Sequence, residues 1–168
     1  MNQSSFVSSR SPAAGPQAAH LGWRFALIRS QWHAEIVQRA CDAFLAELAQ
    51  DRSPPPAVDV FEVAGAFEIP LHALRLAQTG RYAAVVACGL VVDGGIYRHE
   101  FVAEAVISGL MRVQLDTQVP VISAVLTPKN FHDHDEHRRF FAEHLGTKGR
   151  EAAQACLKTV RSLERLAA

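Results

Sequence analysis

The stretch AAVVACGLVV, residues 83–92, is the part of the sequence that decides the fold. It is an almost unbroken apolar run, which is typical of a strand whose two faces are both covered. Shorter apolar runs and longer helical patterns alternate on either side of it. This alternation predicts an α/β fold in which a parallel sheet lies between helices and the crossover connections are right-handed.

The sheet is completed by three more runs: WRFALIRS (23–30), VDVFEVA (58–64) and VPVISAVLT (119–127), the last interpreted as another buried strand. Apolar residues recurring at every fourth position predict a helix from Trp32, which QDRSPPP (50–56) stops. The other predicted helices span about 70–78, from the end of DGGIYRHEF to about 116, 134–145 and 149–166.

The chain has 168 residues, of which 49% are hydrophobic and 20% charged, as in an ordinary globular domain. Its formal charge is zero, so electrostatics gives no reason to expect nucleic acid or an anionic membrane as a partner. No apolar run approaches the roughly 20 residues that span a bilayer. Residues 1–20, rich in Ser, Ala, Pro and Gln, are expected to form a disordered tail, and residues 21–168 the folded domain.

The three cysteines, Cys41, Cys88 and Cys156, are far apart and form no CxxC pair. Buried thiols in a reducing cytoplasm are therefore a better interpretation than disulfides or a zinc site. FHDHDEHRRF (131–140) lacks a fixed metal-ligand spacing, so it is interpreted as a polar helix start with anion-binding capacity rather than as a metal site.

In open parallel sheets the ligand crevice lies outside the carboxyl ends of the strands. The predicted strand ends therefore bring aromatic, carboxylate, glycine, arginine and histidine groups to one edge, in residues 30–33, 65–68, 90–99 and 127–128.

DGGIYRHEF (93–101) leaves two questions open at that edge. Gly94-Gly95 matches neither a P-loop nor a GxGxxG motif, and is either a tight strand-to-helix turn or a turn that binds phosphate at the next helix N-terminus. Arg98 and His99 are either exposed polar residues or an anion clamp and a proton-transfer group. Cations at a helix N-terminus oppose the helix dipole, so neither belongs there for helix stability.

Three other side chains have a structural and a functional interpretation. Trp32 either covers the core at its rim or stacks on a heteroaromatic ring. Glu68 either favours the start of a helix or accepts hydrogen bonds from a polyol or a ring N–H. Lys148, just before the last predicted helix, is either an exposed lysine or a ligand-binding cation.

Four motifs in order, GAFEIP (65–70), CGLVVDGG (88–95), VPVI (119–122) and KG (148–149), resemble the lumazine synthase family from about Trp23 to the C-terminus. The resemblance implies a flavodoxin-like three-layer subunit with a four-stranded parallel sheet, assembled into pentamers with active sites between neighbours. It also implies the condensation of 5-amino-6-ribitylaminouracil with 3,4-dihydroxy-2-butanone 4-phosphate, which gives 6,7-dimethyl-8-ribityllumazine, phosphate and water without any cofactor.

The resemblance assigns roles by position. Trp32 matches the aromatic residue that stacks on the pyrimidine, and Lys148 matches a lysine contributed by the adjoining subunit. The remaining matches are the ribityl-binding Ala66, Phe67 and Glu68, the ring-contacting Leu90, Val91 and Val92, and the phosphate-turn residues Gly95 and Ile96.

The chain departs from the family pattern at the catalytic position. Ile96-Tyr97 occupy the places of two small hydroxyl residues, and in ungapped register Arg98 falls on the family's histidine. Either the helix start shifts so that His99 reaches the site, or Arg98 takes over. Histidine offers a proton shuttle that titrates near neutrality, as the joining of an amine to a ketone requires.

Further departures concern the phosphate and the assembly. His137, with Arg138 beside it, falls on the family's phosphate-binding arginine, and Ser123 replaces a pocket aromatic. GTKG (146–149) lacks the glycine-asparagine extension of capsid-forming members, which favours a pentamer or two face-to-face pentamers. The pattern resembles the divergent second bacterial type of the family.

An active lumazine synthase is thus the expected function. The alternative is an oligomer that binds flavin, such as riboflavin, or lumazine and has little catalytic activity, which the departures at 96–98 motivate. A generic flavodoxin-like signalling domain is disfavoured, because the strand ends lack the acidic cluster of a phosphoacceptor site.

Overall fold

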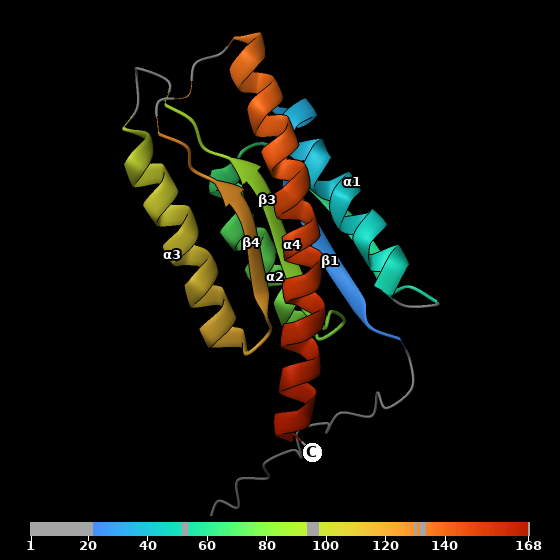
Figure 1. Cartoon of the computed structure of the whole chain (residues 1–168). Coiled ribbons are helices and arrows are strands. Elements are labelled where there is room, and N and C mark those ends of the chain that lie inside the picture. Colours follow the sequence, from blue (N-terminus) through green and yellow to red (C-terminus); the bar gives the residue numbers. More distant parts are fainter. Residues whose placement is uncertain (1–21, 52–53, 94–97, 130, 132–133, 168) are drawn as a thin grey trace, which may run out of the picture.

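The computed structural model describes residues 22–51, 54–93, 98–129, 131 and 134–167 (Figure 1). The expected tail at 1–20 and the expected phosphate-turn residues Gly95 and Ile96 lie outside these residues.

The four predicted strands form one parallel sheet. They are β1 (Arg24–Ser30), β2 (Ala57–Val63), β3 (Ala84–Leu90) and β4 (Val121–Leu126). Their order is β2-β1-β3-β4, and every neighbouring pair runs parallel. This order is that of the flavodoxin-like sheets, which confirms the predicted fold class.

The central strand β3 is buried along its whole length, as its apolar sequence predicted. The prediction that residues 119–127 form another buried strand was right about the strand and only partly right about its burial. In β4 only Ala124 and Val125 are buried, because this strand lies at the edge of the sheet.

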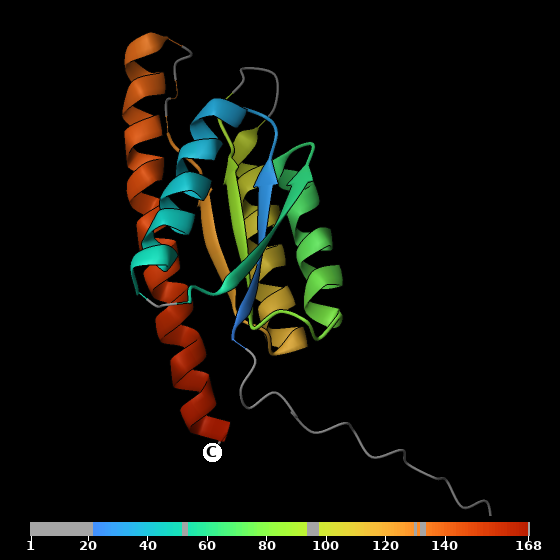
Figure 2. The same ribbon diagram turned by 90° about the vertical axis from the view of Figure 1, so that its right-hand side faces the viewer.

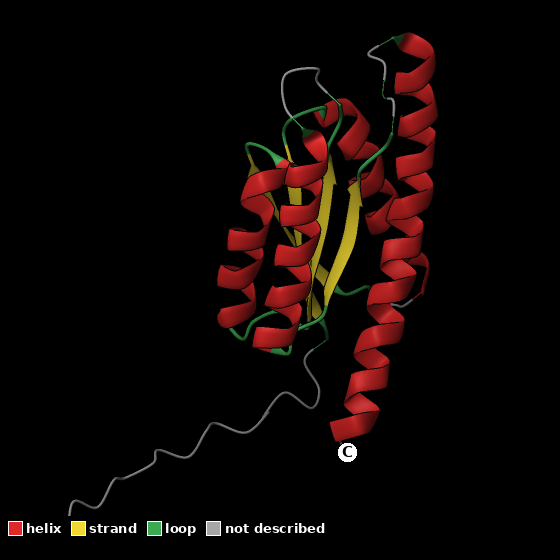
Figure 3. Cartoon of the chain, turned by 90° about the vertical axis from the view of Figure 1, so that its left-hand side faces the viewer, coloured by secondary structure: helices red, strands yellow, loops and turns green. Residues whose placement is uncertain are grey.

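Helices cover both faces of the sheet (Figures 2 and 3). One face carries α1 (Ala34–Asp51) and α4 (Asp135–Ala167), and the other carries α2 (Ile69–Gln78) and α3 (His99–Thr117). Each face has its own hydrophobic core. Phe25, Phe44 and Leu145 are among the buried residues of the first, and Ile28, Ile69 and Val106 among those of the second.

The sequence predicted two helices at 134–145 and 149–166, and this was wrong because α4 continues unbroken through both. Gly149 does not end the helix. A Cβ atom built on it would lie 2.1 Å from the carbonyl oxygen of Ala40, so glycine is needed for the close approach of α4 to α1. The glycine pattern at 146–149 therefore marks a helix crossing rather than a turn.

The predicted thiols are confirmed: Cys41, Cys88 and Cys156 are free and buried. Across the described residues, no helix combines the length and apolar character needed to cross a bilayer.

Candidate functional site at the carboxyl edge of the sheet

A cavity of about 210 Å³ opens where the strands end. Its walls come from the segment after β1, from the 3-10 helix η1 (Ala66–Glu68), from the end of β3 and from the start of α3. The lining residues are Trp32, His33, Ala66, Phe67, Leu90, Val91, Val92, His99 and Val102. Seven of these lining residues were predicted from the sequence, and a single chain brings them to one cavity: Trp32, Ala66, Phe67, Leu90, Val91, Val92 and His99.

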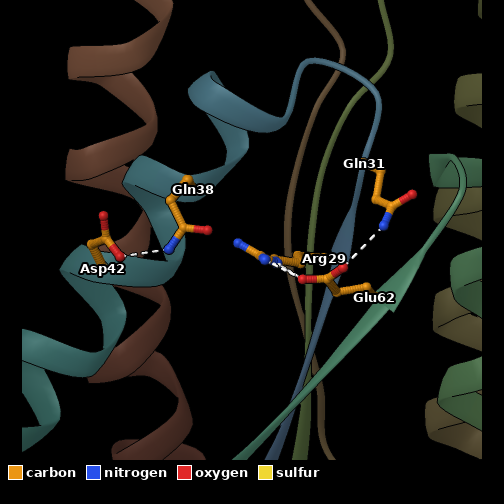
Figure 4. A network of polar contacts seen from close by, with 5 residues as sticks. All are labelled: Arg29, Gln31, Gln38, Asp42 and Glu62. Carbon is orange, nitrogen blue, oxygen red and sulfur yellow. Dashed lines mark hydrogen bonds and ion pairs between the residues drawn. The ribbon is translucent and has the colours of Figure 1, made fainter.

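Trp32 is held at the rim by the backbone that precedes it. The N–H groups of Gln31 and Trp32 donate to the carbonyl groups of Val63 and Ala64, at 2.9 and 3.2 Å, and extend the pairing of β1 with β2. Side chains reinforce this end of the strand, because Glu62 accepts hydrogen bonds from Arg29 and, at 2.9 Å, from Gln31 (Figure 4). Trp32 is 67% exposed, so it is a rim aromatic that a ligand in the cavity can reach.

Gly65 provides the space in which Trp32 and Glu68 meet. A Cβ atom there would lie 3.2 Å from both the Trp32 ring and the Glu68 carboxylate. Glu68 Oε2 accepts a hydrogen bond from the Gly65 N–H at 2.8 Å. Glu68 thus fulfils the structural interpretation made for it, a stabilised helix start, and it is not among the residues that line the cavity.

The close packing of η1 on the sheet depends on Gly89. A Cβ atom on this residue would approach Ile69 Cδ1 at 3.2 Å and Ala66 Cβ at 3.4 Å. Beyond it the Val91 N–H donates to the Leu126 carbonyl at 2.9 Å, which fixes the chain after β3. The apolar side chains of residues 90–92 are therefore presented to the cavity on a rigid support.

The structure places His99 in the cavity wall and Arg98 outside it. The His99 side chain is 16% exposed, and its Nδ1 lies 4.0 Å from Asp93 Oδ1 and 3.7 Å from Glu100 Oε2. Arg98 precedes α3, is exposed, and holds its guanidinium 4.7 Å above the Phe101 ring. In this arrangement the His99 imidazole, and not the Arg98 guanidinium, is within reach of a cavity-bound molecule.

Three predicted site residues lie away from the cavity of their own chain. Ser123 is exposed in the middle of β4, and His137 lies 6.5 Å from the Phe131 ring, in the first turn of α4. Lys148 is mid-helix and pairs with Glu151 at 2.7 Å. The start of α4 lies at the carboxyl edge of the sheet (Figure 1). At a rise of about 1.5 Å per residue, Lys148 is about 20 Å along the helix from that start.

Sequence reasoning missed two lining residues, His33 and Val102. The signal for His33 was its position beside Trp32 at a strand end, and the signal for Val102 was its place one helical turn after His99.

The region around 131–140 gathers aromatic and imidazole rings. His134 and His137 have ring centroids 4.4 Å apart, and Phe131 packs against both His137 and Phe141. Within the described ranges, no group of three or more His, Cys, Asp or Glu residues is arranged to hold a metal ion.

A flavodoxin-like α/β domain with a mostly apolar cavity at the carboxyl edge of its sheet, an exposed aromatic rim and two histidines in the cavity wall belongs to the class of proteins that bind small molecules at this edge. The family model of 6,7-dimethyl-8-ribityllumazine synthase matches residues 22–164, so the chain belongs to this family, whose members are transferases of riboflavin biosynthesis. The resemblance seen in the sequence motifs is confirmed.

Known relatives agree with this assignment. A 6,7-dimethyl-8-ribityllumazine synthase from Rhodococcus erythropolis is 61% identical over 145 residues, which cover 86% of this chain and 94% of the relative. A 6,7-dimethyl-8-ribityllumazine synthase 2 from Pseudomonas syringae is 55% identical over 151 residues, covering 88% and 89% of the two chains. Another synthase 2, from Bradyrhizobium diazoefficiens, is 57% identical over 143 residues, covering 85% and 86%. A binding protein without activity is not favoured by these relationships.

Proposed function

We propose that this chain condenses 5-amino-6-ribitylaminouracil with 3,4-dihydroxy-2-butanone 4-phosphate to give 6,7-dimethyl-8-ribityllumazine, phosphate and water. The observation that carries the proposal is the placement of an inward imidazole, His99, in an apolar cavity rimmed by Trp32. The 5-amino group of the pyrimidine attacks the ketone, and a first water leaves as the imine forms. Phosphate is then eliminated, and attack of the ribitylamino nitrogen on the remaining carbonyl closes the ring with loss of a second water. Holding both substrates together supplies much of the acceleration.

The roles follow from position. Trp32 stacks on the pyrimidine, Glu68 with Ala66 and Phe67 binds the ribityl chain, and the backbone of residues 90–92 contacts the ring. His99 transfers protons during imine formation and ring closure. Gly95, Ile96 and Arg98, which precede α3 in the sequence, bind the phosphate of the second substrate.

We propose that the remaining groups come from a neighbouring subunit. Ser123, His137 and Lys148 do not line the cavity of their own chain, yet they match family positions at the site. Exposed apolar side chains on α3 support an interface between copies: Phe101, Ile107, Met111 and Leu115. The assembly is a pentamer or a pair of pentamers, and its free thiols suit a reducing cytoplasm.

A steady-state assay with both substrates, followed by the fluorescence of the lumazine product, tests the function. The wild-type chain is expected to exceed the spontaneous reaction clearly. His99→Ala is expected to lower kcat by about 10²- to 10⁴-fold, the range for loss of a general acid–base group. Arg98→Ala is expected to act mainly on the KM of the phosphate substrate.

Two results would overturn these assignments. A larger loss of kcat in Arg98→Ala than in His99→Ala would give the proton-transfer role to the arginine position. Absence of turnover above the spontaneous rate, together with tight binding in a riboflavin titration, would make the chain a flavin-binding oligomer instead.

A further inference from the structure

We propose that His33 is a substrate-contacting residue, whose imidazole hydrogen-bonds the polar edge of the heterocyclic substrate; this inference rests on the proposed function. It concerns a residue that no motif of the family resemblance includes.

The composition of the cavity wall is the first argument. Apart from His33 and His99, the described lining side chains are apolar or aromatic: Trp32, Ala66, Phe67, Leu90, Val91, Val92 and Val102. A pyrimidine with amino and carbonyl groups loses its hydrogen bonds to water on entering such a cavity, and each one left unmatched costs binding free energy. Within the described wall, the Trp32 indole offers only an N–H donor and His99 is used for proton transfer, so His33 is the remaining lining side chain that can either donate to or accept from that edge.

The backbone of His33 is the second argument. Its φ is +57°, a left-handed conformation that costs a residue with a side chain roughly 1–2 kcal/mol relative to the right-handed one. Its carbonyl oxygen accepts hydrogen bonds from the N–H groups of Ile36 and Val37, at 2.9 and 3.1 Å, and so starts α1. Glycine would serve this backbone role without strain, so the histidine side chain is explained by something other than the turn.

The surroundings of the ring are the third argument. Its centroid lies 5.5 Å from that of Phe131, with the rings edge to face. This contact orients the imidazole, while among the described residues neither ring nitrogen of His33 has a hydrogen-bond partner. A half-buried, oriented ring at a cavity wall is thus available to a ligand.

The test compares two substitutions that both tolerate left-handed backbone. His33→Gly removes the side chain, and His33→Asn keeps a hydrogen-bonding group on the same backbone. His33→Gly is expected to raise the KM for 5-amino-6-ribitylaminouracil about 3- to 10-fold, the usual effect of one lost hydrogen bond, with kcat nearly unchanged. His33→Asn is expected to recover most of that affinity.

Gln118→Gly is the matched control. Gln118 also has positive φ, +58°, but it lies at the C-terminal end of α3, remote from the cavity-lining residues. It is expected to leave KM unchanged, which separates relief of backbone strain from loss of a ligand contact.

A fluorescence titration with 6,7-dimethyl-8-ribityllumazine keeps this test independent of turnover, so failure of the proposed reaction and failure of the His33 contact give different results. Equal lumazine affinity in wild type and a folded His33→Gly would overturn the contact. An equal loss of affinity in both variants, with an equal fall in Tm, would also overturn it and make His33 a packing partner of Phe131.

Discussion

Cys156 illustrates how a single buried residue makes stability depend on pH. Its thiol is fully buried in α4, and burial raises its pKa from the ordinary 9.0 to about 12. The folded chain therefore retains this proton at pH values where the unfolded chain has released it. The contribution of the protonated Cys156 thiol to the free energy of unfolding is therefore fully present below about pH 9. It is lost as the pH rises from 9 toward 12.

We expect Cys156→Ala to flatten part of this alkaline decline. Urea denaturation at several pH values between about 8 and 11 gives the free energy of unfolding of the wild type and the variant. The readout is the difference between the two proteins in the slope of this free energy against pH. The absolute stability of the variant also falls because a buried sulfur is removed. Parallel pH profiles in the two proteins would contradict the role of the thiol.

The proposed catalytic position shows what the sequence could and could not predict at this scale. The motifs placed Trp32, Ala66, Phe67 and the 90–92 run at the strand ends, and the structure brings their side chains to one cavity. They could not choose between Arg98 and His99. Adjacent residues at a helix start point about 100° apart, so the phase of the helix decides which one faces inward. His33 lay within the strand-end residues 30–33 but was assigned no role, because no motif of the resemblance includes it.

At the scale of the elements, Gly149 controls the packing of the two helices on one face of the sheet. We expect Gly149→Ala to destabilise the fold by roughly 1–3 kcal/mol or more, because the added methyl group collides with the Ala40 carbonyl and α1 must move from α4. The free energy of unfolding in denaturant measures the effect.

Gly146→Ala is the matched control in the same helix. Its Cβ would have no other atom within 4 Å, so alanine is expected to be neutral or stabilising by up to about 1 kcal/mol. Equal effects of the two substitutions would show that helix propensity, rather than the crossing, sets the outcome.

These glycines also explain the one error in the predicted helices. The sequence predicted a break between two helices at residues 146–148, where α4 is continuous. Apolar runs located all four strands to within a few residues, since burial on both faces or one face leaves a clear pattern. A glycine that permits a close helix crossing looks the same in sequence as one that ends a helix. The partner surface, the Ala40 backbone, is more than a hundred residues away, and no local pattern reveals it.

At the scale of the whole molecule, α3 presents an apolar stripe away from its own core. Met111 and Leu115 are 53% and 68% exposed, and Phe101 and Ile107 lie on the same exposed side of the helix. Contiguous exposed apolar surface on a small domain marks an interaction site.

We expect Met111→Lys to weaken the assembly, because a charge at a buried interface loses its hydration. Size-exclusion chromatography with light scattering measures the mass at several protein concentrations. Met111→Leu, which keeps the apolar surface, is expected to retain the wild-type mass. An unchanged mass in Met111→Lys would place the interface elsewhere on the molecule.

The distance of Lys148 from its own cavity has a consequence for mixtures of intact and damaged copies. Under the proposed assembly, each subunit supplies His99 to one site and Lys148 to another. A subunit with a substitution at Lys148 keeps an intact cavity of its own but impairs the active site of its neighbour. Activity is then lost at a site whose cavity belongs to a chain of normal sequence. Dominance of such an allele then depends on how copies are arranged in the ring, and two differently damaged chains restore working sites when they meet as neighbours.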